Sequence, residues 1–452
     1  MKKLAGVLAV LALTVMVAAC GDRGSDSSGG TDGPATTEPA KAAEGDWGDL
    51  KGVCGPNDGG GAVPTGDDSQ GVTEDSIELG TVADPGFSAR PGLNQELFDS
   101  GDAFVEWCNA AGGINGKKLT LNKHDAKLTD YKPAIDEACE TDFALVGGGA
   151  VQDNLWETTG VPCDLIDVAG FAVTPEKAGL AGQTPEETRT IQPVPNPGDR
   201  YPVAGLKLVN AEYPDAKATT GFLTADFQTL AAQFDKESQA FESVGHEIVY
   251  KGVYGINGEA NWKPFATAMQ NDDVQFVKFI GEGANAAGLE QAMDQVGFKP
   301  QVRFYETNFY DQSFVDSAGA AADGALISTA FIPLEEADTH PATQQYIDVL
   351  DAQGGKQAVL GVQSMSAWLL FATLARDCDQ ADDLTRSCIL KGAEGVTEWT
   401  AGGLHAPTNP AENTGSECQM VLEVKDSKFT RWGPTDEDFS CGEDNIAEVE
   451  PA

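Results

Sequence analysis

The sequence has 452 residues, 41% of them hydrophobic, which is too long for one ordinary core and predicts two or three packing units. Its formal net charge of −42 excludes binding to nucleic acid and a polybasic grip on anionic lipid, because both require clustered Lys and Arg. Such acidity favours solubility, and a saline habitat is one source of it.

The N-terminal segment is typical of an exported protein. Lys2 and Lys3 precede an apolar run over residues 4–17, and small residues then lead to Cys20 in the sequence VAAC. VAAC resembles a bacterial lipobox, which predicts a lipoprotein signal peptide over residues 1–19 and a lipid on Cys20 that anchors the mature protein. The alternative is a plain secretory signal that happens to contain Cys20.

Residues 20–72 predict a flexible tether between the lipid and the globular part. The segment is rich in Gly, Ser, Thr, Pro and Asp and has few large apolar residues. Trp47 and Cys54 are exceptions, so we expect the second half of the tether to dock on the globular part.

The globular part opens with a predicted parallel βαβ unit. Apolar residues alternate over residues 77–83 as in a strand, recur at helical spacing from Leu97 to Ala111, and lead to a second strand over residues 118–125. Ligands of such sheets gather at the strand ends that face the loop. The loop over residues 84–93 is therefore the first place to expect a binding site.

Helices and strands continue to alternate, which predicts an α/β fold with two lobes and a cleft between their loop-bearing strand ends. Prolines crowd the segment from 191 to 202 and mark a crossover between the lobes. A tail over residues 396–441 is expected to form short β segments closed by a disulfide. The remaining predicted strands are 143–149, 161–170, 218–224, 247–254, 274–280, 302–306 and 325–331, and the predicted helices are 130–140, 229–244, 262–270, 287–296, 341–353 and 363–376.

Removal of Cys20 leaves eight of nine cysteines, an even number that suits disulfides in an oxidising compartment. Eight thiols allow roughly a hundred pairings, so the sequence does not determine the connectivity. Proximity along the chain favours Cys108 with Cys139, Cys378 with Cys388 and Cys418 with Cys441, which leaves Cys54 for Cys163.

Two glycine motifs are candidate ligand contacts. Gly281 and Gly283 fit a GxGxxA dinucleotide motif that ends at Ala286, but an exported protein meets little NAD, and the same turn offers helix-start N–H groups to a ligand carboxylate. The glycines over residues 147–149 allow a ligand to approach the backbone, or they form a tight turn without a ligand.

The sequence does not assemble a catalytic site. The histidines form no HExxH pair, no CxxC pair occurs, and no GxSxG elbow lies in the folded part. Paired carboxylates are uninformative in so acidic a chain. We therefore expect no enzyme, no cofactor and no metal site. The histidines concerned are His124, His246, His340 and His405.

VAAC, the polar tether, IELGTVAD with its Gly/Pro loop and AGGINGKKLTL together resemble the solute receptors of ABC importers in the branched-chain amino acid (leucine/isoleucine/valine) family. The resemblance spans about residues 71–441, and GGLHAP over 402–407 is similar to a turn in actinobacterial members. It implies a type I periplasmic-binding-protein fold of two Rossmann-like lobes joined by a hinge. The implied lobes are residues 73–194 with 326–395, and residues 195–325 with 396–445.

The resemblance also implies where a ligand binds. Amino-acid receptors of this family place hydroxyl side chains after the third and fourth strands, where this chain has Val151, Gln152 and Asp153, and then Ala169 to Phe171. An acid and an aromatic of the second lobe meet the ligand ammonium. Related receptors carry a disulfide at the places of Cys108 and Cys139. The expected ligand-binding residues are Phe87, Arg90, Gln152, Gly170, Asp226, Phe227, Glu282, Glu306 and Tyr310.

The function implied is that of an extracytoplasmic substrate-binding protein for transport. It captures a small organic solute, such as an amino acid, an amide or a related compound, and delivers it to ABC permease subunits. The lipid holds it on the outer face of the cell membrane. The alternatives are a ligand-sensing receptor lobe for a signalling partner and a secreted α/β hydrolase.

Overall fold

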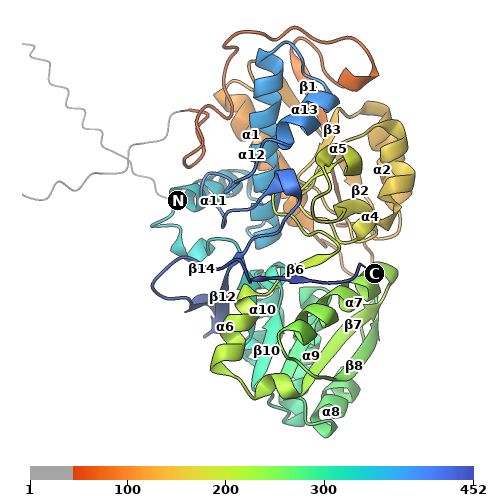
Figure 1. Ribbon diagram of the computed structural model, residues 1–452, viewed down its shortest axis with the longest axis vertical. Coiled ribbons are helices and arrows are strands. Elements are labelled where there is room, and N and C mark those ends of the chain that lie inside the picture. Colours follow the sequence, from red (N-terminus) through yellow and green to blue (C-terminus); the bar gives the residue numbers. More distant parts are fainter. Residues whose placement is uncertain (1–43, 452) are drawn as a thin grey trace, which may run out of the picture. The chain divides into compact units, whose positions relative to one another are not determined.

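The computed structural model describes residues 44–451 (Figure 1). The predicted signal peptide, the lipidated Cys20 and the first part of the tether lie outside the described residues.

A parallel sheet with strand order β2-β1-β3-β4-β5 forms the centre of the first lobe. β1 and β2 pair along their whole length, from Ser76 opposite Lys118 to Ala83 opposite Asp125, which confirms the predicted βαβ unit. The strands are β1 (Ser76–Ala83), β2 (Lys118–Asp125), β3 (Ala144–Val146), β4 (Asp167–Val168) and β5 (Thr190–Ile191).

Successive residues of β1 face two different helix layers, as the period of two in a strand requires. Ile77 and Leu79 belong to the core shared with α1 and α12, whereas Val82 belongs to the core shared with α2 and α3. Figure 1 shows α1 and α12 side by side, and α11 and α13 pack beside them. The helices of this lobe are α1 (Gln95–Ala111), α2 (Tyr131–Thr141), α3 (Trp156–Thr159), α4 (Pro175–Ala178), α5 (Pro185–Thr188), α11 (Pro341–Gln353), α12 (Val359–Gln380) and α13 (Arg386–Ala393).

The second lobe is built on a larger sheet with strand order β13-β12-β11-β10-β9-β7-β8, in which β12 runs antiparallel to both of its neighbours, β11 and β13. β14 pairs with β12, and β15 pairs with β6 in a separate ribbon. The strands are β6 (Arg200–Pro202), β7 (Thr220–Asp226), β8 (Ile248–Gly255), β9 (Phe276–Phe279), β10 (Val302–Tyr305), β11 (Leu326–Thr329), β12 (Cys418–Lys425), β13 (Lys428–Gly433), β14 (Ser440–Cys441) and β15 (Ile446–Glu448).

Helices also cover both faces of this sheet. Phe222 and Phe304 pack with α6 and α7, whereas their neighbours Leu223 and Tyr305 pack with α8, α9 and α10. The helices are α6 (Ala204–Glu212), α7 (Gln228–Ser243), α8 (Lys263–Asn271), α9 (Gly283–Val296) and α10 (Gln312–Ala318).

Within the described residues the chain passes between the two lobes three times, over residues 192–199, 330–340 and 394–417. The first of these is the proline-rich crossover. The strand β11 is hydrogen-bonded to β10, so it lies with the second lobe, and the chain returns to the first lobe only after this strand. The expected boundary at residue 326 lies at the start of β11. In the structure the second lobe includes β11 and ends after it.

The second half of the expected tether docks on the first lobe. Trp47 is fully buried and meets Trp107 of α1 edge to face, with ring centroids 5.2 Å apart. The backbone N–H of Gly61 donates to the Asp379 carbonyl of α12 over 2.9 Å. Residues 44–72 are thus part of the globular structure.

Four disulfides are formed, two of them as expected and two in a different pairing. Cys378–Cys388 and Cys418–Cys441 confirm the predicted pairs. The pairs Cys108–Cys139 and Cys54–Cys163 were wrong, because α1 and α2 lie on opposite faces of the sheet and their cysteines cannot meet. Cys108 instead bonds to Cys54 of the docked N-terminal segment, and Cys139 bonds to Cys163.

Two further elements differ from expectation. The predicted strand over residues 161–170 forms only β4, because Pro162 lies in a 3-10 turn, Val161–Cys163, that precedes it. Among the described residues, α12 is the helix long and apolar enough to cross a membrane, but 83% of its apolar window is buried in the protein. It is the central core helix of the first lobe.

Candidate functional site

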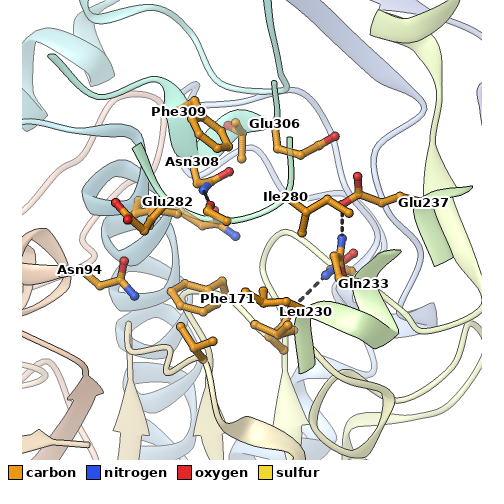
Figure 2. A pocket seen from close by; sticks show the side chains of 18 of the residues that line it. Asn94, Phe171, Leu230, Gln233, Glu237, Ile280, Glu282, Glu306, Asn308 and Phe309 are labelled. Atoms are coloured by element: carbon orange, nitrogen blue, oxygen red, sulfur yellow. Dashed lines mark hydrogen bonds between the residues drawn. The ribbon is translucent and has the colours of Figure 1, made fainter. Parts of the chain in front are cut away.

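A cavity of about 300 Å³ lies where the carboxyl ends of the parallel strands of both sheets meet (Figure 2). Loops after β1, β3 and β4 line it from the first lobe, and loops after β8, β9, β10 and β11 line it from the second. The crossover segment contributes Val194, Pro195 and Asn196. A site at strand ends between two α/β units is the expected place for a ligand.

The wall from the first lobe is almost entirely apolar. Its polar members are the side chains of Asn94 and Gln363, and the carbonyl of Ala172 accepts a hydrogen bond from Asn196 Nδ2 over 2.9 Å. The apolar members are Phe87, Leu93, Leu128, Val151, Phe171, Val173 and Leu360.

Two buried carboxylates hold the loops behind this wall. Asp84 accepts the N–H groups of Leu128 over 2.7 Å and Val151 over 2.9 Å. Asp153 accepts those of Val173 over 2.6 Å and Thr174 over 3.2 Å. Burial raises the pKa of Asp84 to about 6 and that of Asp153 to about 7. The backbone N–H groups at these strand ends thus donate to carboxylates of the same lobe.

The wall from the second lobe combines aromatic rings with carboxylates. Figure 2 shows Glu306, Asn308 and Phe309 across the cavity from Phe171, with Glu237 and Gln233 at one side. Tyr254 and Phe279 stack with ring centroids 5.1 Å apart and add a flat apolar surface. This wall therefore carries most of the polar character of the site.

A buried ion cluster lies directly behind the second wall. Lys278, fully buried on β9, lies 2.9 Å from Oε2 of Glu237 and also donates to Oε1 of Glu306. Tyr201 donates its hydroxyl to the same Glu306 oxygen. Burial lowers the pKa of Lys278, but Glu237 and Glu306 overcome this and raise it, so the amine stays charged. Burial raises the pKa of Glu237, and Lys278 opposes that shift.

Two contacts join the lobes at the mouth of the cavity. Arg90, in the loop after β1, donates Nε to Glu282 Oε1 over 2.6 Å and donates from its terminal nitrogen to Asn285 of α9. Lys356, before α12, donates to Glu96 of α1 over 3.0 Å and to Asp311 of the second lobe over 2.6 Å. Both contacts pair charges from opposite sides of the cleft.

Of the residues expected to bind a ligand, Phe87, Glu282 and Glu306 line the cavity. Arg90 touches it only through its partners Glu282 and Asn285. The others lie elsewhere. Gly170 donates its N–H to Gly148, and Tyr310 donates its hydroxyl to Glu335. Asp226 is exposed at the end of β7, and Phe227 precedes α7. Gln152 does not line the cavity.

The glycine motifs have structural roles. The Glu282 side chain accepts the N–H groups of Ala284 over 2.7 Å and Asn285 over 3.2 Å, so the start of α9 is already capped by a carboxylate. Gly147 has a φ of 69°, and a Cβ there would lie 2.4 Å from the Trp368 indole nitrogen. The glycine allows β3 to approach α12. The start of α9 is therefore not left open to a ligand carboxylate.

Several lining residues were not found from the sequence. Glu237 and Gln233 come from the buried side of α7, and Tyr201 comes from the proline-rich crossover. One signal was present: Lys278 is a lysine inside the apolar strand VQFVKFI, and a buried lysine requires a carboxylate partner. No group of three or more His, Cys, Asp or Glu within residues 44–451 is arranged to hold a metal ion.

Residues 178–428, more than half of the chain, match a family model described as periplasmic binding protein. No curated protein matched the sequence. The structure is similar to that of a fatty acid ABC transporter substrate-binding protein from Thermomonospora curvata, with a TM-score of 0.68, 15% identity, and coverage of 84% of this chain and 97% of the other.

Two further solved structures share the fold. A branched-chain amino acid ABC transporter protein from Thermus thermophilus with bound valine has a TM-score of 0.67 and 14% identity, with 82% and 97% of the two chains covered. The substrate-binding protein LivJ from Streptococcus pneumoniae in complex with isoleucine has a TM-score of 0.63 and 14% identity, with 78% and 98% covered. These likenesses confirm the predicted fold of two α/β lobes.

Proposed function

The chain belongs to the periplasmic binding protein family, and we propose that it captures a small organic solute outside the cytoplasm and delivers it to an ABC importer. The observation that carries this proposal is the cavity lined by strand-end loops of both lobes. A solute between the lobes is removed from water, so an unmatched polar group on a wrong solute is costly.

The chain connections between the lobes and the charged contacts across the cleft support a receptor that opens and closes. Three connections join the lobes, and Arg90 and Lys356 reach across the cleft to acids of the second lobe. Motion about a few connecting segments admits the solute, and closure brings these charges together. The closed shape is the one that a permease recognises.

The proposed solute has an apolar body. The cavity volume of about 300 Å³ lies at the lower end of the range of about 300–1,000 Å³ that is usual for small-molecule sites. The similar structures come from proteins named for fatty acids, valine and isoleucine. The class expected from the sequence was an amino acid, an amide or a related compound.

We also propose that the protein does not catalyse. Three histidines are buried in structural bonds: His124 with Asp142, His246 with Thr220, and His405 with Ser366. Burial lowers the pKa of His246 to about 3 and that of His405 to about 4, so both are neutral near pH 7. Neutral, fully bonded imidazoles are poor proton carriers.

Lipid anchoring at Cys20 on the outer face of the cell membrane completes the proposal. It rests on the VAAC sequence and on the even number of cysteines that remain. The four disulfides of residues 44–451 support an oxidising compartment.

The test starts from the solute that copurifies with the full chain, identified by mass spectrometry. Uptake of that solute, isotopically labelled, is then measured in cells with and without the gene. Restoration by the wild type but not by Ala330→Trp, which fills the cavity wall, supports the proposal. Ala211→Trp, at an exposed position of α6, is the matched control. Uptake that is independent of the gene, or a solute recovered chemically changed, would refute it.

A further inference from the structure

The charged side chains that line the cavity are all acidic. Glu237, Glu282 and Glu306 contribute carboxylates, and no Lys, Arg or His is among the lining residues. Arg90 and Lys278 act from behind these carboxylates. The charged atoms that face a bound solute directly are therefore carboxylate oxygens.

Two of the three carboxylates already have a protein partner on each oxygen. Glu282 accepts hydrogen bonds from Arg90, Ala284 and Asn285. Glu237 accepts from Gln233 over 2.7 Å through one oxygen and pairs with Lys278 through the other. Neither carboxylate therefore presents an oxygen without a partner to the solute.

Glu306 is the carboxylate that is free to act. Its Oε1 accepts from both Tyr201 and Lys278, while its Oε2 has no hydrogen-bond partner among the described residues. Its side chain is 26% exposed and lines the cavity. Glu237 and Glu306 share the Lys278 ammonium, and the charge of the buried Lys236 also acts on both carboxylates. Lys236, a further buried cation, is held by Asn196 and the Pro197 carbonyl and does not line the cavity.

A second observation also points to a polar ligand group at this end. Ser328 lies on β11 and lines the cavity, its residue is 3% exposed, and its hydroxyl has no partner within the described part of the chain. A buried hydroxyl left without a hydrogen bond is costly, so a ligand that pairs with it gains affinity.

The first lobe offers a ligand carboxylate no charged partner, and its polar side chains on the cavity wall are the uncharged amides of Asn94 and Gln363. The N–H groups of Leu128, Val151 and Val173, all lining residues, are taken by Asp84 and Asp153. An anionic group in the cavity would meet apolar walls and like charge without an unpaired cation. Carboxylate-bearing solutes are therefore disfavoured.

Aromatic rings favour the opposite charge. Phe87, Phe171, Tyr254, Phe279, Phe309 and Phe331 line the cavity. The face of an aromatic ring attracts a cation, and desolvation in a cleft strengthens that attraction. An ammonium group beside Glu306 would meet both a carboxylate and ring faces.

We infer that the solute is a small organic cation, an apolar or aromatic body that bears an amine or quaternary ammonium and no carboxylate, with its cationic head at Glu306. The inference rests on the proposed function as a solute receptor, and it specifies the solute class of that same cavity. The body lies against the apolar wall of the first lobe.

The test is a matched series of probes that share one aromatic body. Phenethylamine carries the ammonium, phenethyl alcohol is neutral, phenylacetate is anionic, and phenylalanine adds a carboxylate to the amine. Binding to the full chain is measured by calorimetry and by the shift in melting temperature at neutral pH. We expect phenethylamine to bind at least about tenfold more tightly than phenylacetate and phenylalanine.

A variant then locates the cationic head. Glu306→Gln keeps the shape and removes the charge, and it is expected to weaken phenethylamine about tenfold while changing phenethyl alcohol by less than about threefold. Glu242→Gln, at an exposed position of α7, is the matched control and should change neither. The melting temperature of the unliganded variant verifies that it is folded.

The outcomes separate the two proposals. Phenylacetate or phenylalanine binding as tightly as phenethylamine overturns the inference on solute class and leaves a solute receptor standing. Absence of any melting shift with millimolar phenethylamine also overturns it, whatever Glu306→Gln does. Tight binding of the amine without any role of the gene in uptake leaves the solute class intact and overturns transport.

Discussion

Arg90 of the first lobe and Glu282 of the second form an ion pair across the mouth of the cavity, with Arg90 Nε 2.6 Å from Glu282 Oε1. Each side chain is 24% exposed, so water only partly screens the pair. Glu282 also caps α9, which fixes the position of the carboxylate that Arg90 meets. The sequence placed both residues among the ligand contacts, and the structure joins them to each other.

Arg90→Ala should shift the protein towards an open arrangement of the lobes. The change removes the ion pair with Glu282 and the hydrogen bond to Asn285, two contacts that join the lobes. Small-angle X-ray scattering of the unliganded chain should show a larger radius of gyration. Lys123→Ala, which breaks an ion pair with Asp102 inside the first lobe, is the control and should leave the radius unchanged. Equal scattering curves for Arg90→Ala and wild type would count against the contact.

Lys278→Met should strongly destabilise the second lobe. It leaves Glu237 and Glu306 buried or half-buried without their shared cation, and loss of one partner of a buried pair costs about 3–5 kcal/mol. Denaturant unfolding measures the loss. Adding Glu237→Gln to Lys278→Met should recover part of it, because the fully buried charge is then gone as well. A double variant less stable than the single one would contradict the proposed balance of charges.

Asp84→Asn should be destabilising by an amount that narrows as pH rises. Burial raises the folded pKa of Asp84 from its usual value of 3.8 to about 6, so the folded wild type holds more protons than the unfolded chain between these values. Wild-type stability from this group is therefore fully present below about pH 4 and falls as pH approaches 6. Asn cannot titrate, and it also loses one of the two N–H acceptors for Leu128 and Val151.

The measurement for Asp84 is a set of unfolding curves of both proteins from pH 4 to pH 8. The difference in unfolding free energy should be largest at the acid end. Asp136→Asn, at an exposed position of α2, controls for the general effect of removing a charge from an acidic protein. A difference in unfolding free energy that stays constant from pH 4 to pH 8 would show that Asp84 does not titrate in the expected window.

The Cys54–Cys108 disulfide should hold the N-terminal segment on the first lobe. In the double variant Cys54→Ser, Cys108→Ser we expect a loss of about 2–4 kcal/mol in stability and faster protease cleavage within residues 44–72. Limited proteolysis followed by mass spectrometry locates the cuts. The corresponding double variant of Cys418 and Cys441 removes a disulfide of the second lobe, and it should leave cleavage of the N-terminal segment unchanged.

Much of the fold follows from local patterns. Alternation over residues 77–83 and helical spacing from Leu97 to Ala111 predicted β1 and α1, since one strand face and one helix stripe must be buried whatever the rest of the chain does. The alternation of strands and helices along the chain then predicted two lobes, with the cleft at the strand ends.

The candidate site was only partly predictable. Phe87, Glu282 and Glu306 line the cavity because they follow strands β1, β9 and β10 directly. Gly170 and Tyr310 belong to loops that line the cavity, yet Gly170 donates its N–H to Gly148 and Tyr310 donates its hydroxyl to Glu335. Asp226 is exposed at the end of β7. Whether a loop residue faces a cleft depends on what its loop packs against, and that partner is distant in the sequence.

The sequence by itself determined the lobes, their order and the strand ends at which a ligand can bind, because hydrophobic periodicity is a local property. Only the tertiary structure decided which side chains meet. Helices on opposite faces of a sheet separated Cys108 from Cys139, and Cys108 bonds to Cys54. Packing of elements that are distant in the sequence paired Lys278 with Glu237 and Glu306, and Arg90 with Glu282. These pairings arise from packing in three dimensions, which spacing along the chain does not encode.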